Sequence, residues 1–384
     1  MKENKTKPDI RFKGFTEAWE QRKLGTLCSL ITKGTTPKDK SGNGEVNFIK
    51  VENIDIDNGE ITSTSKISIV EHEGYLKRSK LKENDILFSI AGTLGRVSVV
   101  KSSILPANTN QALAILRINE GYIPYLTTVL KGQAVEDFIR RNPTIGAQPN
   151  LSLEQVNNLD ISYPNYDEQV RIGQYFSNLD HLITLHQREC DQLKELKKSM
   201  LKKMFPRDES SIPEVRFAGF TDAWEQRKLR DEAIEILAGG DIDKEKTVEN
   251  GKYPIYANAL TNDGIVGYYD DYYRVTAPAV TVTGRGEVGY AKARMTHFTP
   301  VVRLLAVCSN HDCYFLENAI NNHKVVVEST GVPQLTVPQL SSYNIFFPAN
   351  DKEEVRIGKY FHTLDNLITL HQRNYNSLNR CKFS

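Results

Sequence analysis

The glycines of Gly284-Arg-Gly-Glu-Val-Gly289 have the spacing of a dinucleotide-binding loop. In such a loop, the backbone contacts a pyrophosphate at the start of a helix. A strand-like run, Val280–Thr283, does precede the motif, but too little helical pattern follows it before Pro300. The sequence therefore favours a loop between two strands over a cofactor site.

Cys308, His311 and Cys313 have side chains that bind zinc, but their spacing lacks the paired ligands of a zinc site. The chain contains no Walker A lysine motif. Asn142-Pro-Thr-Ile145 matches only part of the Asn-Pro-Pro-Tyr type of tetrapeptide that adenine methyltransferases use. These observations predict a chain with no catalytic residues, no metal and no cofactor of its own.

The composition is that of a globular protein, with 39% hydrophobic and 25% charged residues. The net charge is only +1, whereas dedicated nucleic-acid binders are usually basic. Five scattered cysteines fit a reducing compartment. No window approaches the roughly 18 apolar residues of a membrane span. We therefore expect two or three domains, a cytoplasmic location, and neither signal peptide nor membrane contact.

The most prominent feature of the chain is a segment that occurs twice and is predicted to be a long helix each time. Val170–Arg188 and Val355–Arg373 agree at fifteen of nineteen positions, at an offset of 185, so they are copies. Apolar residues recur in both at spacings of four and three, which is typical of a long helix packed along another helix. Asn165 and Asn350 are the predicted N-caps. The predicted interhelical seam contains Phe176, Leu179, Ile183 and Leu193 of the first helix and Phe361, Leu364, Ile368 and Leu378 of the second.

His186 and His371 occupy matching positions on this seam, which favours a packed pair over a catalytic histidine. The first helix is predicted to end at Phe205-Pro206, because proline cannot continue a helix. Gln187–Arg207 is rich in lysine and arginine. This stretch is interpreted as a solvated helix face, with a stripe facing phosphates or a partner protein as the alternative.

A second repeat precedes each variable stretch. Pro8–Leu24 and Pro213–Leu229 agree at thirteen of seventeen positions, at an offset of 205. A weaker match, starting at Pro149 and Pro333, leads in both halves to an apolar strand that ends in proline. The chain is therefore two copies of one unit, and two such units on two helices predict antiparallel helices with a pseudo-twofold relation.

The stretches between the repeats, Leu30–Asp160 and Ile234–Asn344, share little sequence. Both alternate apolar runs with glycine-rich turns, which predicts β-rich domains. One helix is expected at Tyr125–Arg141, from its apolar face. Strands are expected at residues 47–51, 85–90 and 96–100 of the first stretch and at 275–283 and 301–307 of the second.

The order of these segments, with Gly-Phe-Thr-x-Ala-Trp-Glu-Gln-Arg-Lys-Leu and Leu-Ile-Thr-Leu-His-Gln-Arg, resembles the specificity (S) subunit of type I restriction–modification systems. The chain resembles the members of this family from low-GC Gram-positive bacteria. This resemblance implies a mixed α/β (α+β) fold: two β-rich target-recognition domains separated by two long antiparallel helices, as a pseudo-twofold internal repeat. This chain departs from the family in its short last helix, which ends at Asn379–Ser384.

The resemblance also implies partners. Each target-recognition domain of the family reads one half of a bipartite site in double-stranded DNA. The helices fix the spacer and dock two methyltransferase (M) subunits, and two restriction (R) subunits join outside. S-adenosylmethionine, ATP and Mg are expected in those partners. The chain itself is then non-catalytic, and directs adenine methylation and ATP-dependent restriction.

The predicted domain boundaries follow the repeats. They are a leading segment (1–29), a first target-recognition domain (30–164), a central helix (165–206), a linker with the repeated leading segment (207–233), a second target-recognition domain (234–348) and a short last helix (349–384).

The candidate DNA contacts lie in polar, glycine-rich loops. Lysine and arginine suit phosphate or guanine, whereas asparagine and glutamine suit adenine. Arg96 and Arg285 are expected at corresponding places in the two halves. The candidates are Lys33, Gly34, Thr35, Thr36, Lys38, Thr93, Arg96, Asn108, Asn110 and Gln111 in the first domain, and Gly240, Tyr256, Asn258, Thr283, Arg285 and Lys292 in the second. Each loop is alternatively an ordinary polar turn.

The near-neutral charge keeps one alternative function open. A non-catalytic scaffold, with two ligand-binding lobes on a coiled coil and no affinity for DNA, is compatible with the same repeats.

Overall fold

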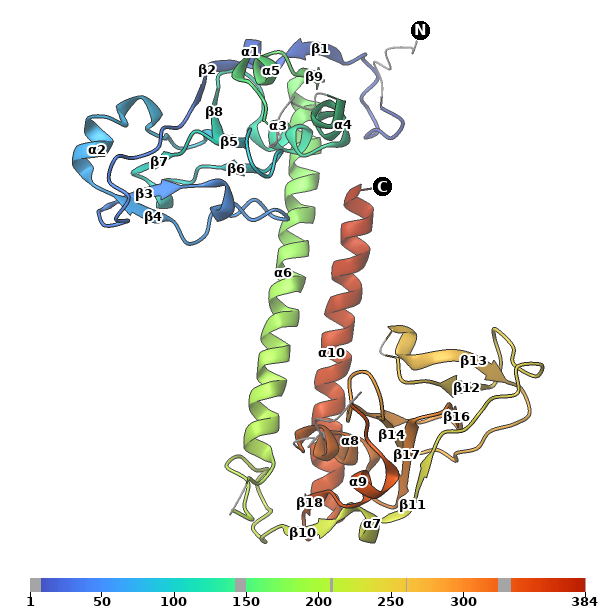
Figure 1. The fold of residues 1–384 in the computed structure, drawn as a ribbon. Helices are drawn as coiled ribbons and strands as arrows, with labels where there is room; N and C mark the ends of the chain where they lie inside the picture. Colours follow the sequence, from blue (N-terminus) through green and yellow to red (C-terminus); the bar gives the residue numbers. More distant parts are fainter. Residues whose placement is uncertain (1–7, 142–149, 208–209, 260, 324–332, 384) are drawn as a thin grey trace. The chain divides into compact units, whose positions relative to one another are not determined.

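The computed structural model describes residues 8–141, 150–207, 210–259, 261–323 and 333–383 (Figure 1). The chain forms two compact units. Unit 1 comprises residues 1–185 and 377–384, and unit 2 comprises residues 186–376. Each of the two long helices therefore contributes residues to both units.

The described residues of unit 1 form three sheets. The main sheet has the strand order β2 (Cys28–Lys33), β8 (Leu113–Ile118), β5 (Ile86–Ser89) and β6 (Val97–Val99). A smaller sheet has the order β4 (Ser65–Ile67), β3 (Val46–Ile49) and β7 (Ala107–Thr109), and β1 (Glu20–Lys23) pairs with β9 (Asp160–Tyr163). Its helices before α6 are α1 (Leu24–Leu27), α2 (Ile69–Glu73), α3 (Ile123–Leu130), α4 (Gln133–Arg141) and α5 (Leu153–Asn157).

Unit 2 has the same strand order. Its main sheet is β11 (Ala233–Ala238), β17 (Leu304–Ser309), β14 (Ala279–Thr283) and β15 (Ala291–Arg294). The smaller sheet is β13 (Ile265–Tyr269), β12 (Tyr253–Tyr256) and β16 (Thr299–Pro300), and β10 (Glu225–Lys228) pairs with β18 (Asn344–Phe347). Its short helices are α7 (Leu229–Glu232), α8 (Cys313–Asn322) and α9 (Val337–Ser341). The two variable stretches thus share a topology despite their different sequences.

Apolar side chains explain this arrangement. In unit 1, Phe88 and Leu116 of the main sheet pack with Leu126 of α3 and Val135 of α4. The helix expected over residues 125–141 is two helices, because the chain turns at Lys131-Gly132 between α3 and α4. The strands β5, β6, β14 and β17 lie within the predicted regions or overlap them, with ends displaced by a few residues.

The long helices begin where the sequence predicts. Helix α6 covers Tyr166–Met204, and α10 covers Asp351–Phe383. The side chain of Asn165 accepts a hydrogen bond from the Glu168 backbone N–H at 3.0 Å, and that of Asn350 accepts one from the Lys352 N–H at 2.9 Å. Both predicted N-caps are confirmed, and α6 ends before Pro206 as expected.

A glycine at the same place in each long helix admits a neighbouring helix. A Cβ atom at Gly173 would lie 2.7 Å from the Tyr125 backbone nitrogen at the start of α3. A Cβ at Gly358 would lie 2.0 Å from Asp312 Oδ1 at the start of α8. The glycine of each Val-Arg-Ile-Gly repeat therefore lets the long helix pack directly on its own domain.

Within unit 2, α6 and α10 run antiparallel. Cys190 Sγ lies 3.5 Å from Gln372 Oε1, and Lys197 Nζ lies 2.6 Å from Asp365 Oδ1. As α6 advances, its partners in α10 therefore fall at lower residue numbers. The predicted seam residue Leu193 packs against a cluster that contains Phe361 and Leu364, and Ile368 is half-buried. In unit 1, Leu179 and Ile183 are buried, and Phe176 and Leu378 are half-buried.

Candidate nucleic-acid interface

Two of the predicted loops in unit 1 lie against each other beyond the end of β2. The Gly34 N–H donates to the Leu113 carbonyl at 3.2 Å, and the Thr36 hydroxyl donates to the side-chain carbonyl of Gln111. A Cβ atom at Gly34 would lie 2.0 Å from the Thr109 carbonyl oxygen, so only glycine permits this approach. These two loops are far apart in the sequence, and the fold brings them together into one surface.

This joined surface, which we call the β2 edge, consists of residues 33–38 and 110–111. Lys33, Lys38 and Gln111 are exposed there. The Lys38 ammonium lies 4.6 Å from the centroid of the Tyr75 ring, which holds the charge near the surface. Asn110 is half-buried, and its side-chain oxygen accepts a hydrogen bond from the Ala112 N–H at 3.2 Å. The β2 edge thus offers cations and an amide to a ligand.

Unit 2 carries a comparable edge after β11. A Cβ atom at Gly239 would lie 1.9 Å from the Val301 carbonyl oxygen, so Gly239 corresponds to Gly34. The neighbouring Gly240, which the sequence selected, donates its N–H to the Pro300 carbonyl at 3.2 Å. The glycine that makes the close approach in unit 2 is therefore Gly239, which directly precedes the candidate contact Gly240.

The loops β5–β6 and β14–β15 share a hydrogen-bond pattern that fixes which residues correspond. The Ser89 hydroxyl accepts from the Arg96 N–H at 2.7 Å, and the Thr283 hydroxyl accepts from the Tyr290 N–H at 2.9 Å. Arg96 therefore corresponds to Tyr290. The expectation that Arg96 and Arg285 occupy corresponding places is wrong, since each arginine follows its hydroxyl residue at a different distance.

Arg96 and Arg285 also differ in their environment. The Arg96 guanidinium is half-buried and donates hydrogen bonds to the backbone carbonyls of Val51 and Ile54. The Arg285 side chain is exposed. Asn258 positions the Arg285 loop, because its side-chain oxygen accepts from the N–H groups of Gly284 at 2.8 Å and Arg285 at 3.4 Å. Arg96 therefore stabilises the turn at residues 51–54 of unit 1, whereas the side chain of Arg285 is accessible to a ligand.

Three candidate side chains lie inside the fold. Asn108 is fully buried, and its amide donates to the Leu76 carbonyl at 2.9 Å. Thr283 is buried, and its hydroxyl accepts a hydrogen bond from the Tyr290 N–H within the β14–β15 loop. Tyr256 is buried beneath the Arg294 guanidinium, which lies 3.7 Å from its ring centroid. Burial raises the pKa of Tyr256, and Arg294 opposes this shift. None of the three is accessible to a ligand at the surface, which corrects their selection as contacts.

Of the remaining candidates, Thr35 is half-buried and its N–H donates to the Thr109 carbonyl at 3.0 Å. Thr93 is exposed in the β5–β6 loop. Lys292 is half-buried and forms an ion pair with Asp263. Lys292 is thus partly neutralised within its own domain.

The glycine motif at residues 284–289 and the cysteine–histidine group at residues 308–313 have the residue types of a cofactor or metal site. The structure places the first in a turn and the histidine of the second in ion pairs. Gly284–Gly289 joins β14 to β15 as a hairpin, so no helix follows it. His311 lies between Glu232 and Glu354 rather than beside two cysteines. Among the residues that the structure describes, His186, Glu189 and His371 are the one group of three or more potential metal ligands that converges. The partial match at residues 142–145 lies outside the described residues.

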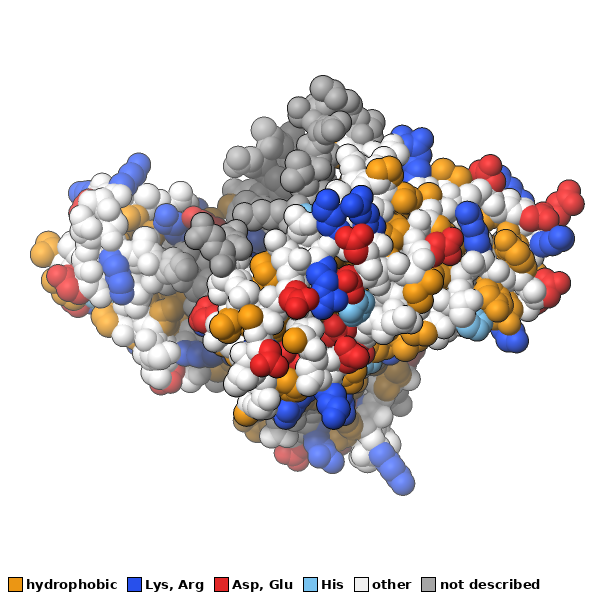
Figure 2. Space-filling model, turned by 90° about the horizontal axis from the view of Figure 1, so that it is seen from below, with side chains coloured by type: hydrophobic (Ala, Val, Ile, Leu, Met, Phe, Trp, Pro, Cys, Tyr) orange, Lys and Arg blue, Asp and Glu red, His pale blue; other side chains and the backbone are white. Residues whose placement is uncertain are grey.

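The charged side chains are mixed rather than segregated. On the face drawn in Figure 2, basic, acidic and apolar side chains are intermingled, in line with the net charge of +1. The basic part of α6 is partly paired within unit 2, by Lys197 with Asp365 and by Lys203 with Glu214. In the described parts of the chain, no helix is long and apolar enough to cross a membrane.

Comparisons with known proteins agree with this architecture. A protein of Mycoplasma pneumoniae named as type I specificity subunit S.MpnORF507P is 27% identical over 217 residues, which are 55% of this chain and 56% of that protein. The EcoBI specificity subunit of Escherichia coli is 30% identical over 161 residues, which are 39% of this chain and 33% of that protein. The chain spans about half the length of the first curated relatives that it matches.

The fold is also that of a solved specificity subunit. The crystal structure of a type I restriction–modification S subunit from M. genitalium matches with a TM-score of 0.68 at 14% identity, over 95% of this chain and 94% of that one. The sequence profile of the type I restriction modification DNA specificity domain matches residues 16–195 and 221–380. Because the profile covers most of both halves and of both long helices, the chain belongs to the family of type I restriction modification DNA specificity domains.

Proposed function

We propose that this chain is the non-catalytic DNA specificity subunit of a type I restriction–modification complex in the cytoplasm. Each of its two target-recognition domains, residues 30–164 and 234–348, reads one half of a bipartite site in double-stranded DNA. The central helix (165–206) and the last helix (349–384) set the spacer and dock two methyltransferase subunits, and two restriction subunits join outside. The segments 1–29 and 207–233 lead into the two halves. The partners supply S-adenosylmethionine, ATP and Mg for adenine methylation and restriction.

One observation carries this proposal. The two halves share a strand order and a nearly identical helical frame, yet their exposed loops differ in sequence. Equivalent loops present different chemistry, since the β5–β6 loop places Arg96 where the β14–β15 loop places Tyr290. A repeated frame with different loops is what two independent half-site readers require.

The exposed loop residues are the proposed contacts. In unit 1, Lys33 and Lys38 of the β2 edge suit phosphates, and Gln111 suits an adenine edge. In unit 2, Arg285 suits phosphate or guanine, because it is exposed and its loop is held by Asn258. The other candidates at the surface of these loops are Thr35, Thr36, Thr93, Asn110, Gly240 and Lys292, and the buried Gly34 allows the β2 edge to form.

The charge balance supports a division of labour between subunits. Non-specific affinity for DNA comes largely from neutralised phosphates and released counterions. A chain with a net charge of +1 neutralises few phosphates. We therefore expect tight binding only from the complex with two methyltransferase subunits, which also must flip the target adenine out of the stack to reach it.

The test is a gel-shift titration of the S chain alone and of the purified complex with methyltransferase subunits. The probe carries a site defined by mapping methylated adenines in the host genome, and control probes carry a scrambled half-site. The expected result is specific binding by the complex alone, weakening steeply as salt rises. Absence of binding by the complex would favour the scaffold with no affinity for DNA, and equal affinity for all probes would contradict recognition of half-sites.

A further inference from the structure

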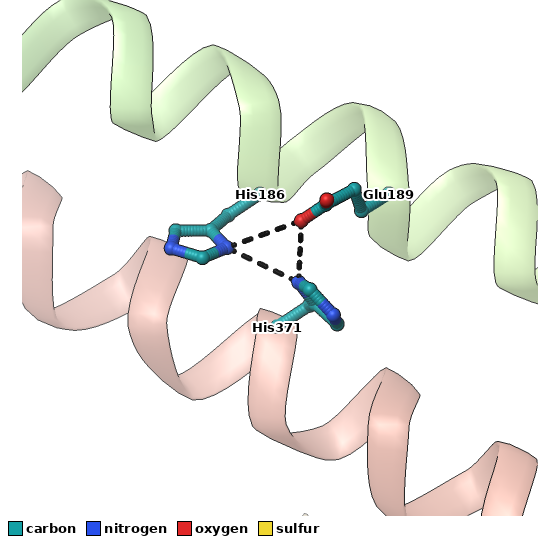
Figure 3. A group of neighbouring side chains, drawn as sticks. All are labelled: His186, Glu189 and His371. Atoms are coloured by element: carbon teal, nitrogen blue, oxygen red, sulfur yellow. Dashed lines mark hydrogen bonds and ion pairs between the residues drawn. The ribbon is translucent and has the colours of Figure 1, made fainter.

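His186, Glu189 and His371 direct three ligand atoms at one point between α6 and α10 in unit 2 (Figure 3). The two Nδ1 atoms lie 3.1 Å apart. Glu189 Oε2 lies 2.9 Å from His371 Nδ1 and 3.5 Å from His186 Nδ1. The side chains of His186 and His371 are 21% and 19% exposed, and that of Glu189 is 39% exposed. The group is therefore held by the seam but remains open to solvent on one side.

A single proton shared among His186 Nδ1, His371 Nδ1 and Glu189 Oε2 cannot form good hydrogen bonds to all of these atoms. Each neutral imidazole has one N–H and one acceptor nitrogen, and an ionised carboxylate only accepts. If His371 Nδ1 carries the proton, it can point at His186 or at Glu189, but not well at both. A cation at the common point would meet all three acceptors at once.

The spacing of the three atoms matches the coordination of zinc. Zn²⁺ binds histidine nitrogen at about 2.0–2.1 Å and carboxylate oxygen at about 2.0–2.2 Å. A triangle with the observed sides has a centre about 1.8 Å from each corner, so an ion slightly out of its plane would reach all three at those lengths. The fourth tetrahedral position would then face the solvent.

We propose that His186, Glu189 and His371 form a binding site for one divalent late-transition-metal ion, with Zn²⁺ as the best-fitting member of that class. The donor set of two imidazoles and one carboxylate separates this class from Mg²⁺ and Ca²⁺, which prefer oxygen ligands alone. A water molecule completes the coordination. The proposal does not depend on DNA recognition, because every ligand lies on the helical frame.

The repeat explains how two of the ligands arose together. His371 is the counterpart of His186 at the repeat offset of 185. In an antiparallel pair of equivalent helices, counterparts meet only where the local twofold axis passes between the helices. The counterpart of Glu189 is Asn374, so only one carboxylate is available. The site therefore binds one ion.

Such an ion would cross-link α6 and α10, because its ligands come from both helices. His371 is 185 residues from His186 in the sequence, and only the folded seam brings it beside His186 and Glu189, so the ion binds the folded seam in preference to the unfolded chain. A ligand that binds only the folded state stabilises it in proportion to the logarithm of its concentration over Kd. We therefore expect Zn²⁺ to raise the thermal midpoint of the chain.

The experiment uses the full chain, freed of metal with a chelator and then titrated with Zn²⁺ by calorimetry. The expected result is one ion per chain and a higher thermal midpoint with Zn²⁺. His186→Gln, His371→Gln and Glu189→Gln should each weaken binding at least tenfold and abolish the thermal shift. The matched controls are His181→Gln and Glu195→Gln, two exposed residues of the same helix, which should leave both readouts unchanged.

Substitution with Co²⁺ identifies the ligand type. Nitrogen and oxygen ligands should give the visible bands of tetrahedral Co²⁺ without the near-ultraviolet thiolate band that the nearby Cys190 would produce. Absence of binding, binding unaffected by all three ligand variants, or binding lost only in Cys190→Ser would overturn the proposal. If a histidine variant fails to fold, Glu189→Gln, at a half-buried position, decides the question, with circular dichroism as the check of folding.

Discussion

Arg216 donates two hydrogen bonds, of 2.6 and 2.7 Å, to the carboxylate of Glu353, which is fully buried in the first turn of α10. Unit 1 repeats this relationship, with two bonds of 2.7 Å from Arg11 to the buried Glu168. In each unit, the arginine comes from the repeated leading segment. In each unit, the repeated leading segment therefore supplies the cation that pairs with a buried carboxylate at the start of the long helix.

Arg216→Ala should strongly destabilise unit 2, because it leaves Glu353 buried without its partner. Breaking a buried ion pair on one side costs about 3–5 kcal/mol in free energy of unfolding. The measurement is the urea midpoint of the full chain. Arg230→Ala is the matched control, since Arg230 pairs with Asp231 at the surface and should contribute at most about 1 kcal/mol. Adding Glu353→Gln to Arg216→Ala should recover part of the loss; no recovery would mean that the charge is not the cause.

The apolar seam predicts a contrast between neighbouring leucines. Leu364→Asp places a charge in the cluster around Phe361 and should cost several kcal/mol unless the helices separate. Leu367→Asp, at an exposed position one turn along α10, should be tolerated. In unit 1, the buried Leu179 and the exposed Leu182 form the same contrast. Circular dichroism and size-exclusion chromatography of each variant test the expectation, and equal behaviour within a pair would reject the assigned helix face.

His311 predicts a pH-dependent contribution to stability. Its Nδ1 lies 3.0 Å from Glu354 Oε2 and its Nε2 lies 2.9 Å from Glu232 Oε2. Burial lowers the pKa of His311, but the hydrogen bonds to Glu354 and Glu232 outweigh it, and the net pKa is raised above its ordinary value. The stabilisation is therefore fully present below the pKa of the unfolded chain and is lost as pH rises through the raised pKa of the folded state.

The destabilisation caused by His311→Gln should accordingly be larger at about pH 6 than at about pH 9. Denaturant midpoints of wild type and variant at both pH values give the comparison. The exposed His181→Gln serves as the control and should show no such difference. A His311→Gln effect that is independent of pH would show that the histidine is neutral in the fold.

Arg96 and Arg285 should respond differently to replacement by alanine. Arg96→Ala removes hydrogen bonds from a charged group to the backbone, each of which is worth about 1.5–3 kcal/mol, and should destabilise unit 1. Arg285→Ala should leave stability unchanged. If Arg285 reads a base, its loss should cost about 1–3 kcal/mol of binding and relax one half-site; if it holds a phosphate, the salt slope should fall by about one. A normal salt slope and unchanged half-site specificity would remove the β14–β15 loop from the interface.

Exchange of a whole domain tests the independence of the halves. Replacing residues 30–160 with the same region of another family member should change one half of the methylated site and leave the other half unchanged. The reason is that each unit contains its own complete sheets and core. Mapping of methylated adenines reports the outcome, and the reciprocal exchange of residues 234–348 is the control. A change in both halves after either exchange would contradict independent recognition.

Local signals in the sequence were sufficient to predict the two long helices, α6 and α10. The N-caps Asn165 and Asn350, the stop at Pro206 and the apolar spacing of four and three depend only on residues within a few turns of one helix. The internal repeat added the antiparallel pairing, because two copies of one helix imply a twofold relation. The mixed fold class and the facing pair of His186 and His371 followed from these signals and are confirmed.

Only the tertiary structure decided which loop residues are buried and which positions of the two halves correspond. Asn108 has the polarity of a contact residue, but strand pairing carries it into the interior beside Leu76. The correspondence of Arg96 with Tyr290 depends on hydrogen bonds across each hairpin, and the two variable stretches are too different in sequence to align. The convergence of Glu189 with both histidines depends on the register of two helices. These features arise from contacts between distant segments, whose geometry the order of residues along one segment does not determine.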